Sequence, residues 1–201
     1  GVLSHGQSAP VHLGKLLELA PDFAMAHALK GLSALMLGRR ELYSVAQEAS
    51  HTAQATLKAG GATRRSPLWC DALQDWLAGH PSHAIGRMEE ALKINPADTI
   101  SMKLSHGIRF ILGDHIGMRQ SVEAVIGAHD KDHALRGYAL GCLAFAMEET
   151  GSYNEAERTG LMGLEYASDD AWGLHAVAHV YDMTHRPTKG ITLIDNNLDA
   201  W

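Results

Sequence analysis

The 201-residue sequence contains only two cysteines, Cys70 and Cys142, and both lie inside helical patterns. They form no Cys-x-x-Cys pair, which argues against a disulfide framework, a zinc ribbon or a thiol redox motif. A glycine-rich phosphate loop and a Gly-x-Ser-x-Gly nucleophile motif are also missing from the sequence. This use of cysteine is typical of a reducing compartment, so we expect a cytoplasmic protein.

Long apolar runs and clustered basic residues are missing as well. The longest weakly polar run, residues 137–147, is about half the length that a membrane-spanning helix needs. The net charge is −6, and the basic pairs Arg39-Arg40 and Arg64-Arg65 are isolated. A nucleic-acid surface normally needs a clustered basic face. We therefore expect neither a membrane nor a nucleic acid as a partner.

The sequence does contain a repeat with a period of 34 residues. Ala84 and Met118 are 34 residues apart, and so are Ala156 and Gly190; the 38 residues between Met118 and Ala156 place extra chain at residues 129–132. A 34-residue unit of two helices is the tetratricopeptide signature. Proline after the second helix of a unit, as in residues 20–22 and 95–98, stops that helix because proline cannot extend the hydrogen-bond ladder.

Helical periodicity extends through the whole chain, and no window keeps the strict alternation of a strand. The sequence predicts an all-α fold, an α/α superhelix of tetratricopeptide-like antiparallel helix pairs. Gly160 and Gly163 depart from the repeat, which prefers an aromatic residue and an alanine there. The predicted helices cover residues 10–19, 22–37, 39–58, 66–78, 81–93, 97–112, 115–127, 133–149, 153–166, 169–184 and 187–194.

Four blocks of sequence go beyond a generic repeat. In chain order they are PDFAMAH (21–27), PADTISMKLSH (96–106), GY with FAMEE (137–138 and 145–149) and DDAWGLHAVAHVYDM (169–183). Together they cover most of the chain, and they resemble the tetratricopeptide repeat protein 38 family. The resemblance implies an α/α superhelix and brings no reaction mechanism with it.

Members of that family are longer than this chain. We therefore expect residues 1–201 to be a single array of about five repeat units and the N-terminal part of a longer array. An array that stops near residues 196–201 would leave an apolar stacking face uncovered. Self-association through this C-terminal end is one way to cover it.

The main candidate site lies in the helix predicted over residues 169–184. His175 and His179 are four residues apart, and Asp182 follows three residues later, so the three side chains project from one face. In the repeat register this face lines the concave groove. Two alternatives follow: the three residues bind a metal ion, or the two histidines hydrogen-bond to neighbouring helices in a polar groove.

Further candidates for the groove come from the other first helices of the pairs. His27 and His106 would add imidazoles, Glu148 a carboxylate and Arg109 a positive charge. Trp172 would add an aromatic face, although such residues are more often part of the core between helices. Other histidines lie in or near predicted loops and call for no special role: His51, His80, His129, His133 and His185.

Two functions are compatible with these patterns. The first is a binding scaffold that recognises a peptide, a protein or a small ligand on its concave face, since helical repeats form extended concave surfaces. It needs no cofactor. The alternative is an enzyme of unknown reaction with His175, His179 and Asp182 at its centre, and in one form of this alternative these residues hold a metal ion. The histidine-containing face favours this alternative, because a pure scaffold could fill the face with apolar groups.

Overall fold

The structure is a computed structural model that describes residues 8–60 and 63–198. These residues form helices and no strand, which confirms the all-α prediction. The helices are α1 (Ala9–Leu19), α2 (Ala24–Met36), α3 (Tyr43–Ala59), α4 (Ser66–Leu77), α5 (Pro81–Ile94), α6 (Thr99–Leu112), α7 (His115–Val125), α8 (Arg136–Glu149), α9 (Tyr153–Tyr166), α10 (Ala171–Met183) and α11 (Pro187–Asp195), with short 3₁₀ turns at Arg40–Leu42 and Ile126–Ala128.

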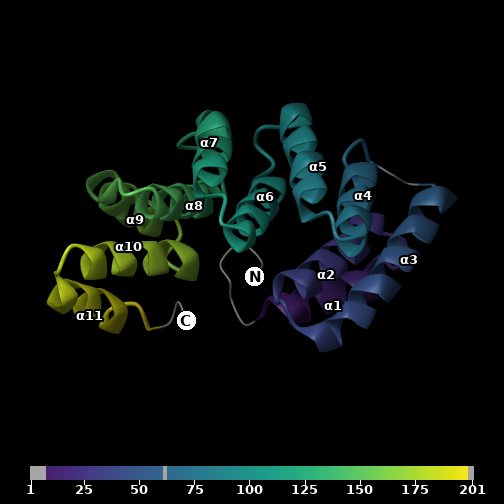
Figure 1. Cartoon of the computed structure of the whole chain (residues 1–201), viewed down its shortest axis with the longest axis horizontal. Coiled ribbons are helices and arrows are strands. Elements are labelled where there is room, and N and C mark those ends of the chain that lie inside the picture. Colours follow the sequence, from purple (N-terminus) through teal and green to yellow (C-terminus); the bar gives the residue numbers. More distant parts are fainter. Residues whose placement is uncertain (1–7, 61–62, 199–201) are drawn as a thin grey trace.

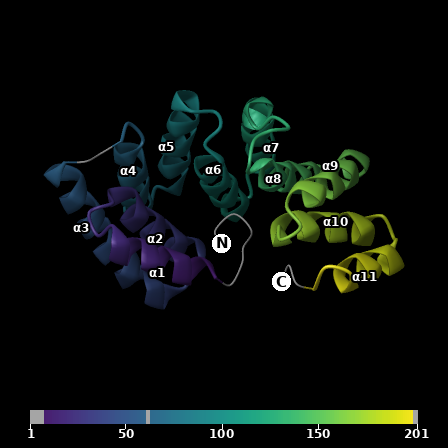
Figure 2. The same cartoon turned by 180° about the vertical axis from the view of Figure 1, so that it is seen from behind.

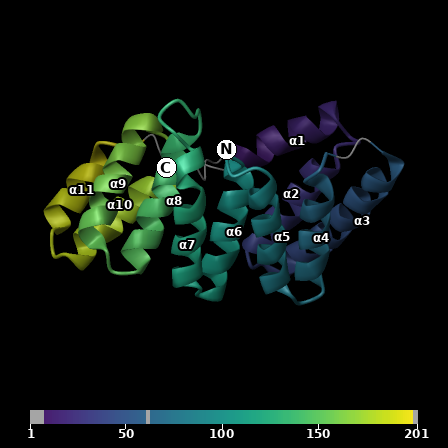
Figure 3. The ribbon, with the colours of Figure 1, turned by 90° about the horizontal axis from the view of Figure 1, so that it is seen from above.

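The helices pack as successive antiparallel pairs along an arc (Figure 1). The pairs are α2/α3, α4/α5, α6/α7, α8/α9 and α10/α11, and the second helix of each pair packs on the first helix of the next. Figure 1 shows α5 and α7 on the outer side of the arc and α6 on its inner side. Seen from behind, α1 lies across α2 (Figure 2). From above, α4 to α7 stand side by side (Figure 3). This arrangement is the predicted α/α superhelix.

Local sequence explains where several helices begin and end. Asp98 and Asp114 precede α6 and α7, and their carboxylates accept hydrogen bonds from the backbone N–H groups of Ser101 (3.3 Å) and Gly117 (3.0 Å). Such caps satisfy amides that the helix cannot pair. α6 ends at Gly113 with a φ of 72°, a backbone conformation that favours glycine. The caps therefore set where α6, which carries part of the candidate site, begins and ends.

Glycines allow the last helix pairs to approach closely. A Cβ atom at Gly160 would lie 2.4 Å from Val177 Cγ2, and one at Gly163 would lie 3.1 Å from the Gly137 carbonyl oxygen. These two positions are the ones where the repeat normally carries larger residues. The departure from the repeat thus has a physical reason: α9 packs so closely on α8 and α10 that no side chain fits.

One histidine is buried although the sequence predicted a position in or near a loop. His129 is fully buried after the Ile126–Ala128 turn. Its Nδ1 donates to the Val125 carbonyl (3.2 Å), so Nε2 is free to accept from the Thr99 hydroxyl (2.9 Å). Burial lowers the pKa of His129 from its ordinary value of 6.5, because the charged form loses its hydration.

We expect this histidine to make the fold sensitive to acid. Because the pKa of His129 is lower in the folded protein, its contribution to the free energy of unfolding is complete above pH 6.5. This contribution is lost as the pH falls toward the folded pKa, by up to about 1.4 kcal/mol per pH unit. His129→Gln should flatten this slope when the free energy of unfolding is measured by urea titration. Parallel slopes for the two proteins would show that His129 does not titrate in this range.

Candidate functional site

Six aromatic and imidazole side chains from α6, α8 and α10 lie against one another. We call this set the inner aromatic cluster. Trp172 is central: its ring centroid lies 4.4 Å from that of Phe145, 5.7 Å from that of Phe110 and 5.7 Å from that of His175, whose plane is nearly parallel. The members are His106, Phe110, Phe145, Trp172, His175 and His179.

The cluster has a buried base and a partly exposed surface. His106 and Phe145 are almost completely buried, and Trp172 donates from Nε1 to His106 Nε2 over 3.1 Å. His106 therefore accepts at Nε2, which fixes the Trp172 ring. Phe110 is 40% exposed, whereas Trp172 and His175 are half-buried. A rigid base beneath an accessible aromatic surface is typical of binding hot spots.

His175 and His179 lie together on α10, as their spacing predicts. Their ring centroids are 4.3 Å apart. Burial lowers the pKa of His175, and the neighbouring His179 lowers it further. His175 therefore favours its neutral form, in which it presents an uncharged ring beside Trp172.

A buried charged group lies beneath Trp172. Lys103 Nζ is 4.8 Å from the centroid of the Trp172 ring, and it has no hydrogen-bond partner among the described residues. Its charge acts on the buried Asp170 carboxylate, whose pKa burial raises to about 6 although Lys103 lowers it. The backbone amides of Trp172 and Gly173 also lower the pKa of Asp170. Neither amide is placed well enough to form a hydrogen bond with the Asp170 carboxylate.

Cys142 is buried beside the same two charges. Burial raises the pKa of its thiol to about 11, against the lowering effect of Lys103. A thiolate is the reactive form of cysteine. Cys142 is therefore a packing residue of α8 and no nucleophile.

Carboxylates and imidazoles meet at the end of α8. Glu148 is buried with 6% exposure, and its Oε1 lies 3.8 Å from His179 Nδ1, too far for a hydrogen bond. Its Oε2 has no hydrogen-bond partner within the described residues. Burial raises the pKa of Glu148 from 4.5. The adjacent Glu149 lies 2.8 Å from His115 Nδ1 across the start of α7.

Two of the sequence-predicted candidates lie outside this region. His27 on α2 lies 2.7 Å from the carbonyl oxygen of Pro21 through Nε2 and does not contact the inner aromatic cluster. Arg109 is on α6 but projects toward α5 and α7, where it pairs with Glu89 and Asp114. Arg109 follows His106 by three residues, but these two ion pairs hold its guanidinium group away from the cluster.

The third metal-ligand candidate, Asp182, is exposed near the end of α10, and Glu148 is the acidic partner of His179. Across residues 8–60 and 63–198, no three histidine, cysteine or acidic side chains are grouped so that they could hold a metal ion. The metal-dependent enzyme and its cofactor stay predictions.

Sequence reasoning missed two aromatic members of the cluster and the buried acid beneath it. Phe110 follows His106 by four residues and Phe145 precedes Glu148 by three, so each shares a helix face with a candidate already identified. This spacing was a usable signal. Asp170 carried no signal of its own, because its burial depends on how α10 packs on α6 and α8.

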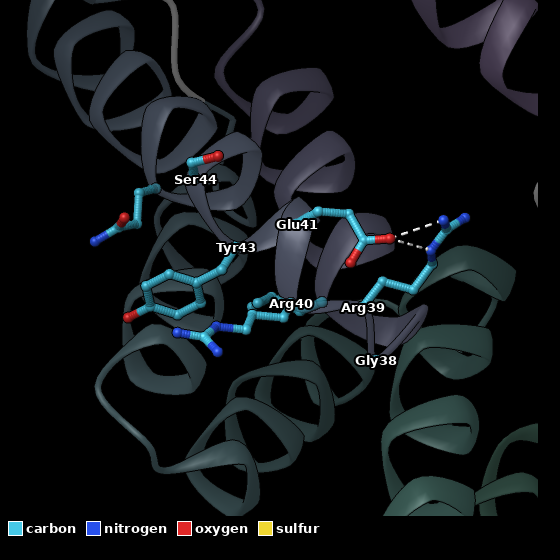
Figure 4. A pocket seen from close by; sticks show the side chains of 8 residues that line it. Gly38, Arg39, Arg40, Glu41, Tyr43 and Ser44 are labelled. Carbon is cyan, nitrogen blue, oxygen red and sulfur yellow. Dashed lines mark hydrogen bonds and ion pairs between the residues drawn. The ribbon is translucent and has the colours of Figure 1, made fainter.

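A surface depression also lies away from the cluster. It has a volume of about 610 Å³ and lies at the turn from α2 to α3. Figure 4 shows Arg40 extended beside the Tyr43 ring, while Arg39 pairs with Glu41. The depression is open, and its arginines are exposed. The inner aromatic cluster is the better candidate, because its groups are buried, mutually supported and electrostatically perturbed.

No protein-family model matches the chain. The resemblance to the tetratricopeptide repeat protein 38 family therefore stays a prediction. Within the part of the chain that the structure describes, no helix is long and apolar enough to cross a membrane.

Proposed function

We propose that this chain is a binding module that recognises a peptide through the inner aromatic cluster. One observation carries the proposal: rings from α6, α8 and α10 form a single surface that is partly exposed and rests on buried side chains. The rings bury large apolar areas on contact and lose little conformational entropy, which makes them efficient binding groups. Helical repeats supply the extended surface on which a peptide can lie.

Selection of binders from a library of random short peptides tests this function, with affinities measured by fluorescence anisotropy. Phe110→Ala should weaken the selected peptides at least about tenfold, since hot-spot aromatics contribute about 2 kcal/mol or more. Phe110 is suited to the test because its exposure limits the effect on folding.

The matched control is Tyr166→Ala, which removes a ring that is 49% exposed on α9. It should leave the affinity unchanged. Equal losses in both variants, or no selected binder at all, would contradict the assignment of the inner aromatic cluster as the binding surface.

A further inference from the structure

The carboxylate of Glu148 lies one turn along from the aromatic rings of the cluster. Phe145 and Glu148 are three residues apart on α8, and they face His175 and His179, which are four residues apart on α10. A ligand that covers the ring of His175 is therefore within one helical turn of the Glu148 carboxylate.

One oxygen of this carboxylate lacks the hydrogen-bond partner that a buried charge normally has. Only 6% of the surface of Glu148 is exposed, and its Oε2 receives no hydrogen bond from the described residues. Burying a charged group without a partner is costly, so such groups are normally paired or hydrogen-bonded. A ligand that donates N–H groups to Glu148 would supply the missing interaction.

The charges around the cluster favour a cation. Lys103 and Asp170 carry opposite charges and offset each other beneath Trp172. The remaining charged side chains at the end of α8 are the carboxylates of Glu148 and Glu149, which lie beside His179 and His115. Arg119 on α7 pairs with Glu123 and donates hydrogen bonds to the hydroxyls of Thr150 and Ser152, which follow α8. The local charge is therefore negative.

We propose that this surface recognises an arginine side chain of the bound peptide, a specificity that rests on the proposed peptide-binding function. The guanidinium group is planar, so it stacks on aromatic and imidazole faces and donates two parallel N–H groups to a carboxylate. Trp172 and His175 supply the faces, and Glu148 supplies the carboxylate.

His179 is an exposed side chain next to the Glu148 carboxylate. The His179 side chain is 48% exposed, and exposed side chains change rotamer within nanoseconds. Binding of arginine to Glu148 thus requires the His179 imidazole to rotate away from the carboxylate. The arrangement also favours arginine over lysine, because a lysine ammonium binds the carboxylate without stacking on the rings.

The test uses labelled peptides that differ only at one central residue, which is arginine, lysine, methionine or glutamate. The arginine peptide should bind about tenfold more tightly than the methionine peptide, which corresponds to one charge-assisted hydrogen-bonded contact. Glu148→Gln should abolish this preference while the methionine peptide keeps its affinity. Glu165→Gln removes the same charge from an exposed position on α9 and should preserve the preference.

A second variant keeps the test informative if Glu148→Gln folds poorly. His179→Ala removes the imidazole that lies beside Glu148 and should increase the preference for arginine over methionine. Peptides that bind without a preference for arginine, or with one that does not depend on Glu148, would overturn this inference and leave the binding function standing. If none of the four peptides and no library peptide binds at concentrations up to about 1 mM, both proposals fail.

Discussion

Gly137→Ala is expected to lower the free energy of unfolding by about 3 kcal/mol, at the upper end of the effect of overpacking. An added Cβ would lie 2.5 Å from Ala167 Cβ, 2.8 Å from the Ala167 backbone nitrogen and 2.8 Å from the Gly163 carbonyl oxygen. Two of these atoms belong to the backbone and cannot rotate away. The start of α8 must therefore move from the end of α9, which disrupts their packing.

The matched control is Gly86→Ala on α5, where an added Cβ would meet nothing within 4 Å. The free energy of unfolding of the control should rise by up to about 1 kcal/mol, because alanine favours a helix more than glycine does. Urea unfolding followed by circular dichroism measures both. If the two variants show the same gain, α8 and α9 are not as close as the structure places them.

The positions of the helices follow from the sequence, because the signals that begin and end a helix lie in neighbouring residues. The 34-residue spacing and the prolines at residues 81 and 187 place α5 and α11 to within a residue of the structure. The requirement for glycine at Gly137 could not be predicted. It depends on how closely α9 approaches α8, and that distance is set by side chains from two helices together.

The candidate site shows the same division between local and tertiary information. Spacing alone places His175 and His179 on one face of α10, and their rings are in contact. It cannot say which residues of other helices meet that face. For this reason the sequence suggested His27 and Arg109, whereas the structure brings Phe110 and Phe145 to Trp172. His129 is a similar case, since its burial depends on Thr99 of the preceding helix pair.

The second large effect is expected from Lys103→Met, which removes the charge that faces the buried Asp170. At about pH 8 the variant should lose about 3 kcal/mol of stability, because breaking a buried charge interaction leaves one charge uncompensated. Methionine keeps most of the side-chain volume beneath Trp172. The loss should therefore reflect the charge and not a cavity.

The pH dependence identifies Asp170 as the cause. Burial raises its folded pKa from 3.8 to about 6, so its contribution to stability is complete below 3.8 and is lost as the pH rises through the folded pKa. Above about pH 6 the contribution of Asp170 to the stability of the wild-type protein stays constant. In Lys103→Met the folded pKa rises further, since the positive charge that lowers it is gone. The stability of the variant should therefore keep falling toward about pH 8, and the cost at about pH 5 should be only about 1 kcal/mol.

Adding Asp170→Asn to Lys103→Met separates this explanation from a loss of packing. The double variant contains neither charge, so it should recover about 2 kcal/mol at about pH 8 and lose the dependence on pH between about 5 and 8. Urea titrations at both pH values measure the difference in the free energy of unfolding. All proteins compared should carry His129→Gln, so that titration of His129 does not add to the pH dependence. A cost of Lys103→Met that is equal at both pH values, and unchanged by Asp170→Asn, would show that Lys103 acts on Trp172 alone and that the Asp170 carboxylate does not depend on it.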